Sequence, residues 1–227
     1  MKADFAVSVI VPVYNNAAIL AETIRQLTSY LAREFTRYEL IFVDDASIDE
    51  SWSLLKLAAG ENPNIRLLRH SINLGQQWAS ARGAFAAQEA ILISVDCDLP
   101  CKLEDLKKLA IAASNGIELV LGRRIGGRPR IWWREVGSAC VAVLTSLLYS
   151  YRIQDFGCST GAARREVIDR LRGKTPKVIK IQLLEEAHSF AEIEIDASQE
   201  IKRTESGYTF RALFRLFWTI IWYKIAR

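Results

Sequence analysis

The sequence predicts an α/β fold built on an open, mainly parallel β-sheet, and three observations lead to this prediction. Five short runs rich in Val, Ile and Leu are apolar nearly throughout, as strands buried on both faces of a sheet are. Segments with helical spacing separate these runs, so strand and helix alternate along the chain. The length of 227 residues favours one large domain, which can bury a sizeable core without disulfides or metal.

The first half of the chain contains the five expected strands. They are Val7–Val13, Tyr38–Val43, Ile65–Leu68, Ile91–Val95 and Glu118–Leu121. Leucine and isoleucine recur at helical spacing from Leu20 to Leu31, with Asn16 as the expected N-cap. Ser47 and Glu50 form a capping box, so a second helix is expected directly after Asp45.

From about residue 122 the pattern changes. The stretch GRRIGGRPRIWWR, which begins at Gly122, is typical of a loop, and a strongly apolar helix is expected over Val136–Tyr149. Val167–Leu171 predicts a further helix, Glu192–Ile195 a weak strand, and Phe210–Tyr223 a helix with its aromatic residues on one face. Because no internal repeat or linker interrupts the chain, residues 1–227 are interpreted as a single domain.

Composition and charge exclude several classes of protein. Half of the residues are hydrophobic and a quarter are charged, which excludes a disordered or low-complexity chain. A net charge of +4 is too small to indicate nucleic-acid binding. We expect no signal peptide and no membrane-spanning helix. In a reduced setting the cysteines are expected to be buried, without disulfides or zinc. They are Cys97, Cys101, Cys140 and Cys158.

Polar or charged side chains follow each of the five expected strands. The segments are Tyr14 to Asn16, Asp44 to Ser47, Asn73 to Gln76, Asp96 to Asp98 and Gly122 to Arg124. In an open parallel sheet, ligands bind at the carboxyl ends of the strands. We therefore expect these side chains to converge on one rim and to form a ligand site there.

The motifs of the common nucleotide-binding folds are absent. A dinucleotide fold needs G-x-G-x-x-G in the first strand-to-helix turn, where this chain has PVYNNAAI without glycine. A P-loop needs Lys-Ser or Lys-Thr after its glycines, where this chain has Arg128-Pro129. Phosphotransfer folds with an Asp-x-Asp nucleophile carry it after the first strand, whereas this pair follows the fourth.

Asp96 and Asp98, separated by one residue at the end of an apolar strand, predict a metal site. Hard divalent cations take oxygen ligands and keep water and substrate phosphate in their remaining positions. The alternative is that Asp98 caps a helix expected over Leu103–Ala113 and that Asp96 is an ordinary loop acid.

Two basic segments point to anions or to an interface. Residues 123–134 carry five arginines and no acid, and arginine suits phosphate recognition. Trp132 and Trp133 within this stretch favour an interface or a membrane surface. The basic, aromatic segment 210–227 is typical of a helix that lies in a membrane interface, although packing on the domain or in a homodimer would equally account for it.

Several motifs occur together in a defined order. They are SVIVPVYNN, FVDDASID, NLGQQWASARG, VDCDLP, GRRIGG, Arg134-x3-Ser138, DFGCSTGA and RTESGYT. Together they resemble the family 2 glycosyltransferases of the GT-A fold, and within them the polyprenyl-phosphate sugar transferases similar to dolichol-phosphate-mannose synthase. The resemblance covers nearly the whole chain.

The resemblance implies a Rossmann-like, mainly parallel open sheet with helices on both faces and a C-terminal acceptor-side subregion. Residues 1–122 would be the nucleotide-sugar-binding half, 123–209 the acceptor-side half, and 210–227 an amphipathic helix. It also implies inverting transfer from a nucleotide-sugar, UDP- or GDP-linked, to polyprenyl phosphate for cell-surface polysaccharide or protein glycosylation. This metal-dependent reaction, with Mg²⁺ or Mn²⁺, would take place on the cytoplasmic side of the cell membrane, in peripheral contact with it.

The resemblance also implies roles for particular residues. The nucleotide side would comprise Pro12, Tyr14, Asn16, Asp44, Asp45, Asn73, Gln76 and Asp96. Asp96 and Asp98 would hold the metal ion, and Arg123, Arg134 and Ser138 would hold the acceptor phosphate. The residues expected to act in catalysis are Asp98, Arg134, Arg203 and Asp155, of which Arg203 matches a loop arginine near the phosphates.

Two departures from the family pattern leave alternatives open. Asn16 stands where the family usually has Glu, and Pro100 stands where it often has Gln, a further metal ligand. One alternative is therefore a non-catalytic nucleotide-sugar-binding module.

A phosphate acceptor is already largely ionised and needs little base catalysis. A hydroxyl acceptor, the other alternative, would need a carboxylate base, for which Asp155 is the nearest candidate.

Overall fold

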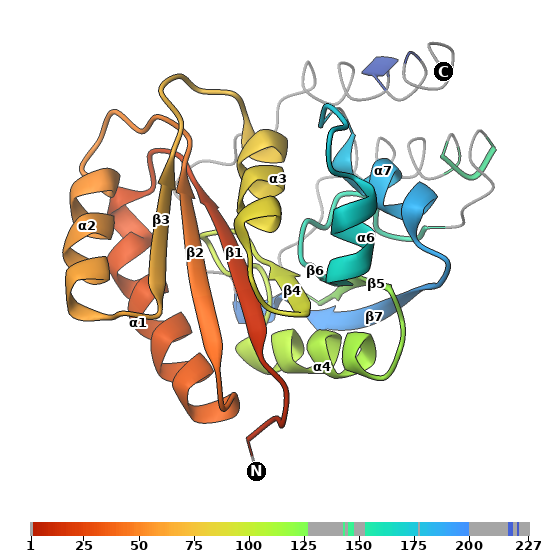
Figure 1. The fold of residues 1–227 in the computed structure, drawn as a ribbon, viewed down its shortest axis with the longest axis horizontal. Coiled ribbons are helices and arrows are strands. Elements are labelled where there is room, and N and C mark those ends of the chain that lie inside the picture. Colours follow the sequence, from red (N-terminus) through yellow and green to blue (C-terminus); the bar gives the residue numbers. More distant parts are fainter. Residues whose placement is uncertain are drawn as a thin grey trace.

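The computed structural model describes residues 2–126, 143, 145–147, 153–176, 178–199, 218–219 and 222. Within this part, seven strands form one sheet in the order β3-β2-β1-β4-β6-β5-β7 (Figure 1). The strands are β1 (Val7–Val13), β2 (Tyr38–Asp44), β3 (Ile65–Arg69), β4 (Ile91–Ser94), β5 (Leu119–Ile125), β6 (Gly161–Arg164) and β7 (Phe190–Asp196). Neighbouring strands are parallel except where β6 pairs with β4 and β5. The predicted α/β sheet is confirmed.

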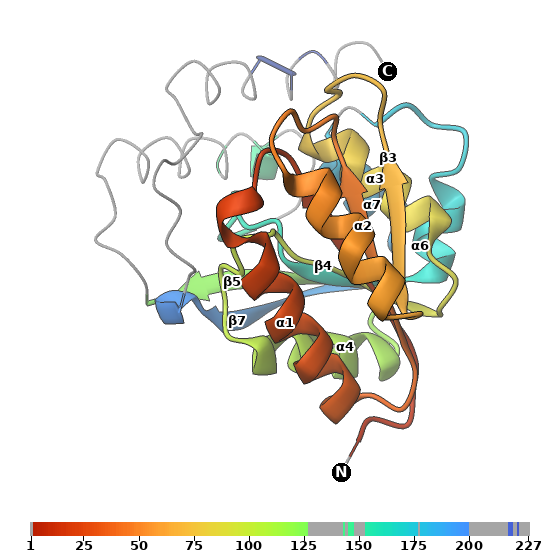
Figure 2. The same cartoon turned by 90° about the vertical axis from the view of Figure 1, so that its left-hand side faces the viewer.

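Helices cover both faces of the sheet, as Figures 1 and 2 show. The helices are α1 (Ala17–Glu34), α2 (Ser51–Glu61), α3 (Gln76–Ala86), α4 (Leu103–Ser114), α6 (Arg165–Arg170) and α7 (Ile179–Glu186), and a 3-10 turn, Ala197–Gln199, follows β7. Helices α1, α2 and α4 pack on one face, and α3, α6 and α7 pack on the other.

The central strand β1 shows why the strand sequences are apolar nearly throughout. Val9 and Val11 pack with Leu27 of α1 in one core cluster, whereas Ile10 packs with Ala79 of α3 in the other. Successive side chains of a strand point to opposite faces, so a strand covered by helices on both sides needs apolar residues at every position.

Strand β5 is longer than predicted. The sequence indicated a strand that ends at Leu121 and a loop that begins at Gly122, but β5 continues to Ile125. The reason is its parallel pairing with β7, in which Arg123 is opposite Glu194. Gly122 to Arg124 therefore lie within the strand rather than after it.

The capping box predicted at Ser47 and Glu50 is wrong. Helix α2 begins only at Ser51. The Ser47 hydroxyl instead accepts a hydrogen bond from the Asn15 backbone N–H at 3.0 Å. The Asp49 carboxylate, which precedes the N-cap residue Glu50, accepts a hydrogen bond from the N–H of Ser51, the first residue of α2, at 3.0 Å.

Strand β6 and helix α7 were not predicted. The sequence of β6, GAAR, has no β-branched or aromatic residue, so it gives no strand signal. Its place in the sheet depends on close approach, since a Cβ added to Gly161 would lie 2.7 Å from the backbone oxygen of Val120. The other late elements agree with expectation: α6 overlaps the predicted helix at Val167–Leu171, and β7 contains the predicted strand.

Several predictions concern segments that the structure does not describe. Most of Val136–Tyr149 and of Phe210–Tyr223 lies outside the described residues, as does Cys140. In the described part, no helix combines the length and the apolar character needed to span a bilayer. Cys97, Cys101 and Cys158 are buried, as predicted, and they form no disulfide within the described part of the chain. Burial raises the pKa of the Cys101 thiol to about 12 and also raises that of Cys158, so both stay protonated.

Gly83 sets the distance between α3 and the sheet. A Cβ at this position would lie 2.5 Å from Cγ2 of Ile10 and 3.0 Å from Cγ2 of Val43. We expect Gly83→Ala to lower the free energy of unfolding by about 1–3 kcal/mol, because an added methyl overpacks this contact. Gly60→Ala in α2 is the matched control: its Cβ would meet nothing within 4 Å, so it should raise that free energy by about 0.5–1 kcal/mol. Urea unfolding measures both, and equal stability of the two variants would contradict the packing argument.

Candidate functional site at the carboxyl edge of the sheet

A cavity of about 360 Å³ lies where β1, β2 and β4 end and α3 begins. We call it the rim cavity. Seven of the eight predicted nucleotide-side residues line it: Pro12, Tyr14, Asn16, Asp45, Asn73, Gln76 and Asp96. Both predicted metal ligands, Asp96 and Asp98, line it as well. Side chains far apart in the sequence therefore meet at this edge of the sheet.

The turns that follow three of the strands have an unusual backbone conformation. Asn15, Ala46 and Leu99 have φ angles of 51°, 61° and 46°. Residues other than glycine rarely adopt this left-handed region, and they keep it where surrounding contacts enforce it. One such contact joins two of these turns, because the Asn15 side-chain oxygen accepts a hydrogen bond from the Ile48 N–H at 2.9 Å. The turns after these strands therefore keep the backbone around the rim cavity in a fixed conformation.

Asn16 occupies the predicted N-cap position of α1, but its side chain does not cap the helix. Its Oδ1 accepts a hydrogen bond from the Tyr14 N–H at 3.1 Å, and its own N–H donates to the Ser51 hydroxyl at 2.9 Å. Asn16 therefore stabilises the turn that presents Tyr14, whose side chain is partly exposed at the cavity.

Asp45 connects the end of β2 to the segment before α3. Its Oδ1 contacts Nδ1 of His70 at 2.7 Å and accepts a hydrogen bond from the Leu74 N–H at 2.9 Å, and its Oδ2 accepts one from the Gly75 N–H at 2.7 Å. Gly75 directly precedes α3 and has a φ of 93°, which glycine adopts readily. These contacts position Gln76 at the cavity. Sequence reasoning missed His70, because a single histidine after a strand carries no motif.

The structure does not bring Asp44 to the rim cavity. Its side chain is fully buried, and Oδ2 lies 2.9 Å from Nε of Arg69. Asp44 is the last residue of β2 and Asp45 follows it. Since successive side chains at a strand end diverge, only Asp45 points into the cavity.

Two neighbours hold the carboxylate of Asp96. Nε2 of Gln76 donates a hydrogen bond to its Oδ1 at 2.6 Å, and the Ser159 hydroxyl donates one to its Oδ2. Ser159 was not predicted: it comes from the DFGCST segment, which the sequence assigned to the acceptor side. The link to Asp96 places that segment directly beside the predicted metal ligands.

The donor set of the rim cavity fits a hard divalent cation. Asp96 and Asp98 supply carboxylate oxygens, which Mg²⁺ and Mn²⁺ prefer. The described residues form no group of three His, Cys, Asp or Glu suited to a metal ion, so phosphate and water oxygens would complete the coordination. The alternative role of Asp98 as a helix cap is wrong, because α4 begins at Leu103 with Lys102 at its N-cap.

The predicted acceptor-side residues Arg123 and Asp155 are held by other side chains. Arg123 donates hydrogen bonds to Gln154 Oε1 at 2.9 Å and to the Glu194 carboxylate. Asp155 is bound in bidentate fashion by Arg124, with Nε–Oδ2 and Nη2–Oδ1 distances of 2.8 and 2.9 Å. Burial alone would raise the pKa of Asp155, but the hydrogen bonds and charge of Arg124 outweigh burial and lower it. A carboxylate with a lowered pKa is a weak base.

Lys180 of α7 binds the backbone of the DFGCST segment with its side-chain ammonium group. Its Nζ donates hydrogen bonds to the backbone oxygens of Phe156, at 2.8 Å, and of Cys158. Burial lowers the pKa of this ammonium group. Lys180 was not predicted either, because the sequence gave no sign of α7.

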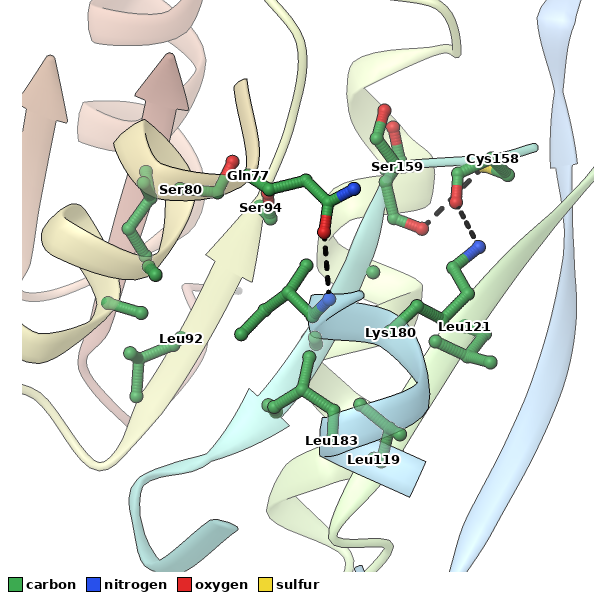
Figure 3. A pocket seen from close by; sticks show the side chains of 18 of the residues that line it. Gln77, Ser80, Leu92, Ser94, Leu119, Leu121, Cys158, Ser159, Lys180 and Leu183 are labelled. Atoms are coloured by element: carbon green, nitrogen blue, oxygen red, sulfur yellow. Dashed lines mark hydrogen bonds between the residues drawn. The ribbon is translucent and has the colours of Figure 1, made fainter. Parts of the chain in front are cut away.

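A second cavity, of about 230 Å³, lies between α3, strands β4 to β6, and helices α6 and α7. We call it the apolar cavity. Its walls are mainly apolar, and Figure 3 shows Leu92, Leu119 and Leu183 among them. Gln76 and Asp96 line this cavity as well as the rim cavity, so the two adjoin at the predicted metal site.

Three predicted residues, Arg134, Ser138 and Arg203, lie outside the described residues. Their assigned roles stay predictions. The same holds for the proposed interface at Trp132 and Trp133.

Comparisons with known proteins identify relatives of the chain. The sequence model of the family described as Glycosyl transferase family 2 matches residues 8–172. Two undecaprenyl-phosphate 4-deoxy-4-formamido-L-arabinose transferases are similar over most of the chain. The Proteus mirabilis protein is 29% identical over 95% of this chain and 66% of its own length, and the Enterobacter sp. protein is 30% identical over 97% and 68%. The chain thus spans about two thirds of the length of these relatives.

Solved structures show the same fold. Glucosyl-3-phosphoglycerate synthase from Mycobacterium tuberculosis, in a complex with Mn²⁺, UDP and glucosyl-3-phosphoglycerate, superimposes with a TM-score of 0.74 at 18% identity, over 99% of this chain and 81% of that one. A further crystal structure of the same synthase gives a TM-score of 0.73 at 16% identity, over 98% and 81% of the two chains. The predicted GT-A architecture is confirmed.

Proposed function

The chain belongs to glycosyl transferase family 2, and from this premise we propose that it transfers a sugar from a nucleotide-sugar to the phosphate of a polyprenyl phosphate. The observation that carries the proposal is the rim cavity, in which Asp96 and Asp98 adjoin six other predicted nucleotide-side residues. A nucleotide in this cavity would have its diphosphate at the two aspartates. Its sugar would then face the DFGCST segment through Ser159.

Asp96 and Asp98 would hold a Mg²⁺ or Mn²⁺ ion at the diphosphate. The bound ion would supply charge stabilisation for the departing nucleoside diphosphate. Gln76 and Ser159 orient the Asp96 carboxylate from both sides, so its position is set before the substrate binds. Asn16 and Asp45 keep the turns around the nucleotide in place.

Two observations support a phosphate acceptor. The curated relatives are undecaprenyl-phosphate transferases by name. In addition, Asp155, the nearest candidate base for a hydroxyl acceptor, is engaged by Arg124 and has a lowered pKa. A phosphate acceptor needs no such base, because it is largely ionised near neutral pH. Arg123, Arg134 and Ser138 would hold that phosphate, and Arg203 would approach it.

A lipid-linked acceptor requires contact with a membrane. We propose that residues 210–227 provide it peripherally, at the cytoplasmic face of the cell membrane. Of this segment the structure describes Trp218, Thr219 and Trp222, which are helical, and both tryptophan side chains are exposed. A homodimer stays a prediction.

The proposal is tested by following the labelled sugar. The purified chain is incubated with Mn²⁺, undecaprenyl phosphate in detergent, a soluble oligosaccharide as the hydroxyl acceptor, and labelled nucleotide-sugars with uridine, guanosine, cytidine or deoxythymidine bases. We expect label in the organic phase with one base only, because a lipid-linked sugar partitions there. Label that enters a water-soluble glycan instead would indicate a hydroxyl acceptor. A nucleotide that raises the melting temperature with Mn²⁺ but gives no transfer to either acceptor would favour the binding module.

A further inference from the structure

The turns at the carboxyl edge of the sheet expose several large apolar side chains. Ile72, in the segment that joins β3 to α3, is 64% exposed, and Leu74 and Trp78 are exposed as well. Ile48, in the segment that joins β2 to α2, is 89% exposed. We call these four residues the edge patch. Scattered apolar residues are ordinary on a protein surface, whereas a contiguous group of them marks an interaction site.

Contacts between the two segments make the patch contiguous. Nη2 of Arg69 donates a hydrogen bond to the backbone oxygen of Ser47, directly before Ile48, at 3.3 Å. Nη1 of Arg82, one helical turn after Trp78, donates one to the backbone oxygen of Arg69 at 2.7 Å. Figures 1 and 2 show the two segments side by side beyond the ends of β2 and β3. The edge patch is therefore one surface, built by two neighbouring turns and the first turn of α3.

The backbone under the patch is held in place before any partner binds. The Asp45 carboxylate accepts hydrogen bonds from the N–H groups of Leu74 and Gly75, at 2.9 and 2.7 Å, and Nδ1 of His70 contacts the same carboxylate. A surface that is already ordered loses little conformational entropy when it binds. A fixed turn thus presents these apolar side chains to solvent.

The segment that carries most of the patch has no acidic residue. Residues 62–88 contain three arginines and neither Asp nor Glu. Arg82 is exposed next to Trp78 on the same side of α3, whereas the charge of Arg69 is balanced by the buried Asp44. Aliphatic side chains, tryptophan and arginine together are typical of surfaces that enter the headgroup region of an anionic membrane.

Two acidic residues, Asp49 and Glu50, follow Ile48 at one end of the patch. The Asp49 carboxylate points back to the protein, because it accepts hydrogen bonds from the N–H groups of Ala17 and Ser51 at 2.9 and 3.0 Å. Glu50 is exposed. The part of the patch around Ile72 is therefore better suited to an anionic surface than the part around Ile48.

The edge patch borders the rim cavity. Asn73 and Gly75 line the cavity, and they alternate along the chain with Ile72 and Leu74 of the patch. Under the proposed function the acceptor phosphate belongs to a lipid, so it reaches this cavity from a membrane surface. A protein seated on the patch would obstruct that approach, whereas a bilayer would supply the acceptor there. The occupant that fits the patch is thus a lipid surface.

We propose that the edge patch inserts into the headgroup region of an anionic bilayer and turns the rim cavity towards the membrane. Ile72 and Trp78 would enter the boundary between headgroups and acyl chains, and Arg82 would lie among the lipid phosphates. This inference rests on the proposed function. It adds a second contact surface to the one proposed for residues 210–227, and it defines which edge of the sheet faces the bilayer.

A charge placed on the patch tests the inference, with the same charge placed elsewhere as the control. Ile72→Glu alters the patch, and Leu57→Glu alters α2 at a side chain that is equally exposed, at 63%. Sedimentation with vesicles of phosphatidylcholine and phosphatidylglycerol measures the partition coefficient of each variant. We expect Ile72→Glu to bind about 10-fold more weakly than the unaltered chain, because burial of one aliphatic side chain contributes at least about that factor. Leu57→Glu should bind as the unaltered chain does.

A second variant tests the role of the arginine. Arg82→Gln keeps a hydrogen-bond donor for the backbone oxygen of Arg69 but removes the positive charge. It should lower binding to vesicles that contain phosphatidylglycerol by about 5-fold, since one basic residue near an anionic surface contributes about that factor. Binding to vesicles of phosphatidylcholine alone should stay unchanged.

Transfer assays separate this inference from the proposed function. With a short, water-soluble isoprenyl phosphate as the acceptor, Ile72→Glu and the unaltered chain should transfer the sugar at the same rate. With undecaprenyl phosphate in vesicles at limiting lipid concentration, Ile72→Glu should be about 10-fold slower, in proportion to its weaker binding.

Two results would overturn the inference. One is vesicle binding that is equal in Ile72→Glu and Leu57→Glu. The other is a loss of self-association in Ile72→Glu without a loss of vesicle binding, which would assign the patch to a second copy of the chain. In either case transfer to the soluble isoprenyl phosphate would leave the proposed function standing. Failure of the unaltered chain to transfer sugar to either acceptor would instead contradict the proposed function.

Discussion

Replacing Asp98 by asparagine is expected to lower sugar transfer by at least about 1,000-fold and to leave the chain folded. The factor corresponds to about 4 kcal/mol of transition-state stabilisation, which is a typical contribution of a metal ion at a leaving phosphate. Asparagine keeps the size of the side chain but supplies a weaker, uncharged ligand. Because the change also removes one of two neighbouring negative charges, the free energy of unfolding should not fall.

The measurement combines transfer assays with melting temperatures recorded with nucleotide, with and without Mn²⁺. The unaltered chain should show a shift that depends on Mn²⁺, and Asp98→Asn should lose it. Asp169→Asn is a suitable control, since Asp169 belongs to α6 and its carboxylate pairs with Arg172 on the surface. If Asp98→Asn keeps the metal-dependent shift and full transfer, Asp98 is not a metal ligand.

The sequence predicted that the side chains of the rim cavity meet at one edge of the sheet, because this convergence depends on the strand topology alone. Parallel strands end at the same edge of a sheet, so polar residues that follow Val13 and Ser94 must approach one another whatever the details of packing. The apolar runs also fixed the strands closely, since burial on both faces leaves a strong signal. These two facts explain why both predicted metal ligands and most of the predicted nucleotide-side residues lie at this edge, while their individual roles come from the family resemblance and stay predictions.

What the sequence missed depends on the direction of single side chains. Asp44 and Asp45 are adjacent and chemically equal, and only their positions at the end of β2 decide that Asp44 binds Arg69 while Asp45 lines the cavity. Ser159 lies in the segment just before β6 and Lys180 lies in α7, and neither of these two elements has a strong propensity signal. Their contacts join residues more than twenty positions apart, and no local pattern encodes such pairs.

Replacing Asp155 by alanine is expected to lower the free energy of unfolding by about 2–4 kcal/mol. The change removes hydrogen bonds from Nε and Nη2 of Arg124 and leaves the guanidinium group without its carboxylate. Breaking a fully buried pair costs about 3–5 kcal/mol. The range expected for Asp155→Ala is lower than this because 39% of the Arg124 side chain is exposed, and solvent screens the ion pair.

The effect should depend on pH in a defined direction. Since the pKa of Asp155 is lowered in the folded chain, its carboxylate stabilises the fold fully above its unfolded pKa of about 3.9. This contribution disappears as the pH falls through the lower folded pKa. The stability difference between the unaltered chain and Asp155→Ala should therefore be largest near neutral pH and shrink below about pH 4, which urea unfolding at several pH values measures. A difference that grows on acidification would contradict the ion pair.

The variant Asp155→Asn separates a structural role from a catalytic one. Asparagine keeps an oxygen for Arg124 but cannot accept a proton from a hydroxyl acceptor. Loss of a general base lowers the rate by about 100- to 10,000-fold and removes the acidic limb of the pH–rate profile. If the acceptor is a phosphate, the acidic limb should stay in place, and the rate of transfer by Asp155→Asn should remain within about 10-fold of the rate of the unaltered chain. The shape of the pH–rate profile thus distinguishes a phosphate acceptor from a hydroxyl acceptor even if Asp155→Asn lowers the stability of the fold. A less stable fold lowers the rate but does not displace the acidic limb of the profile.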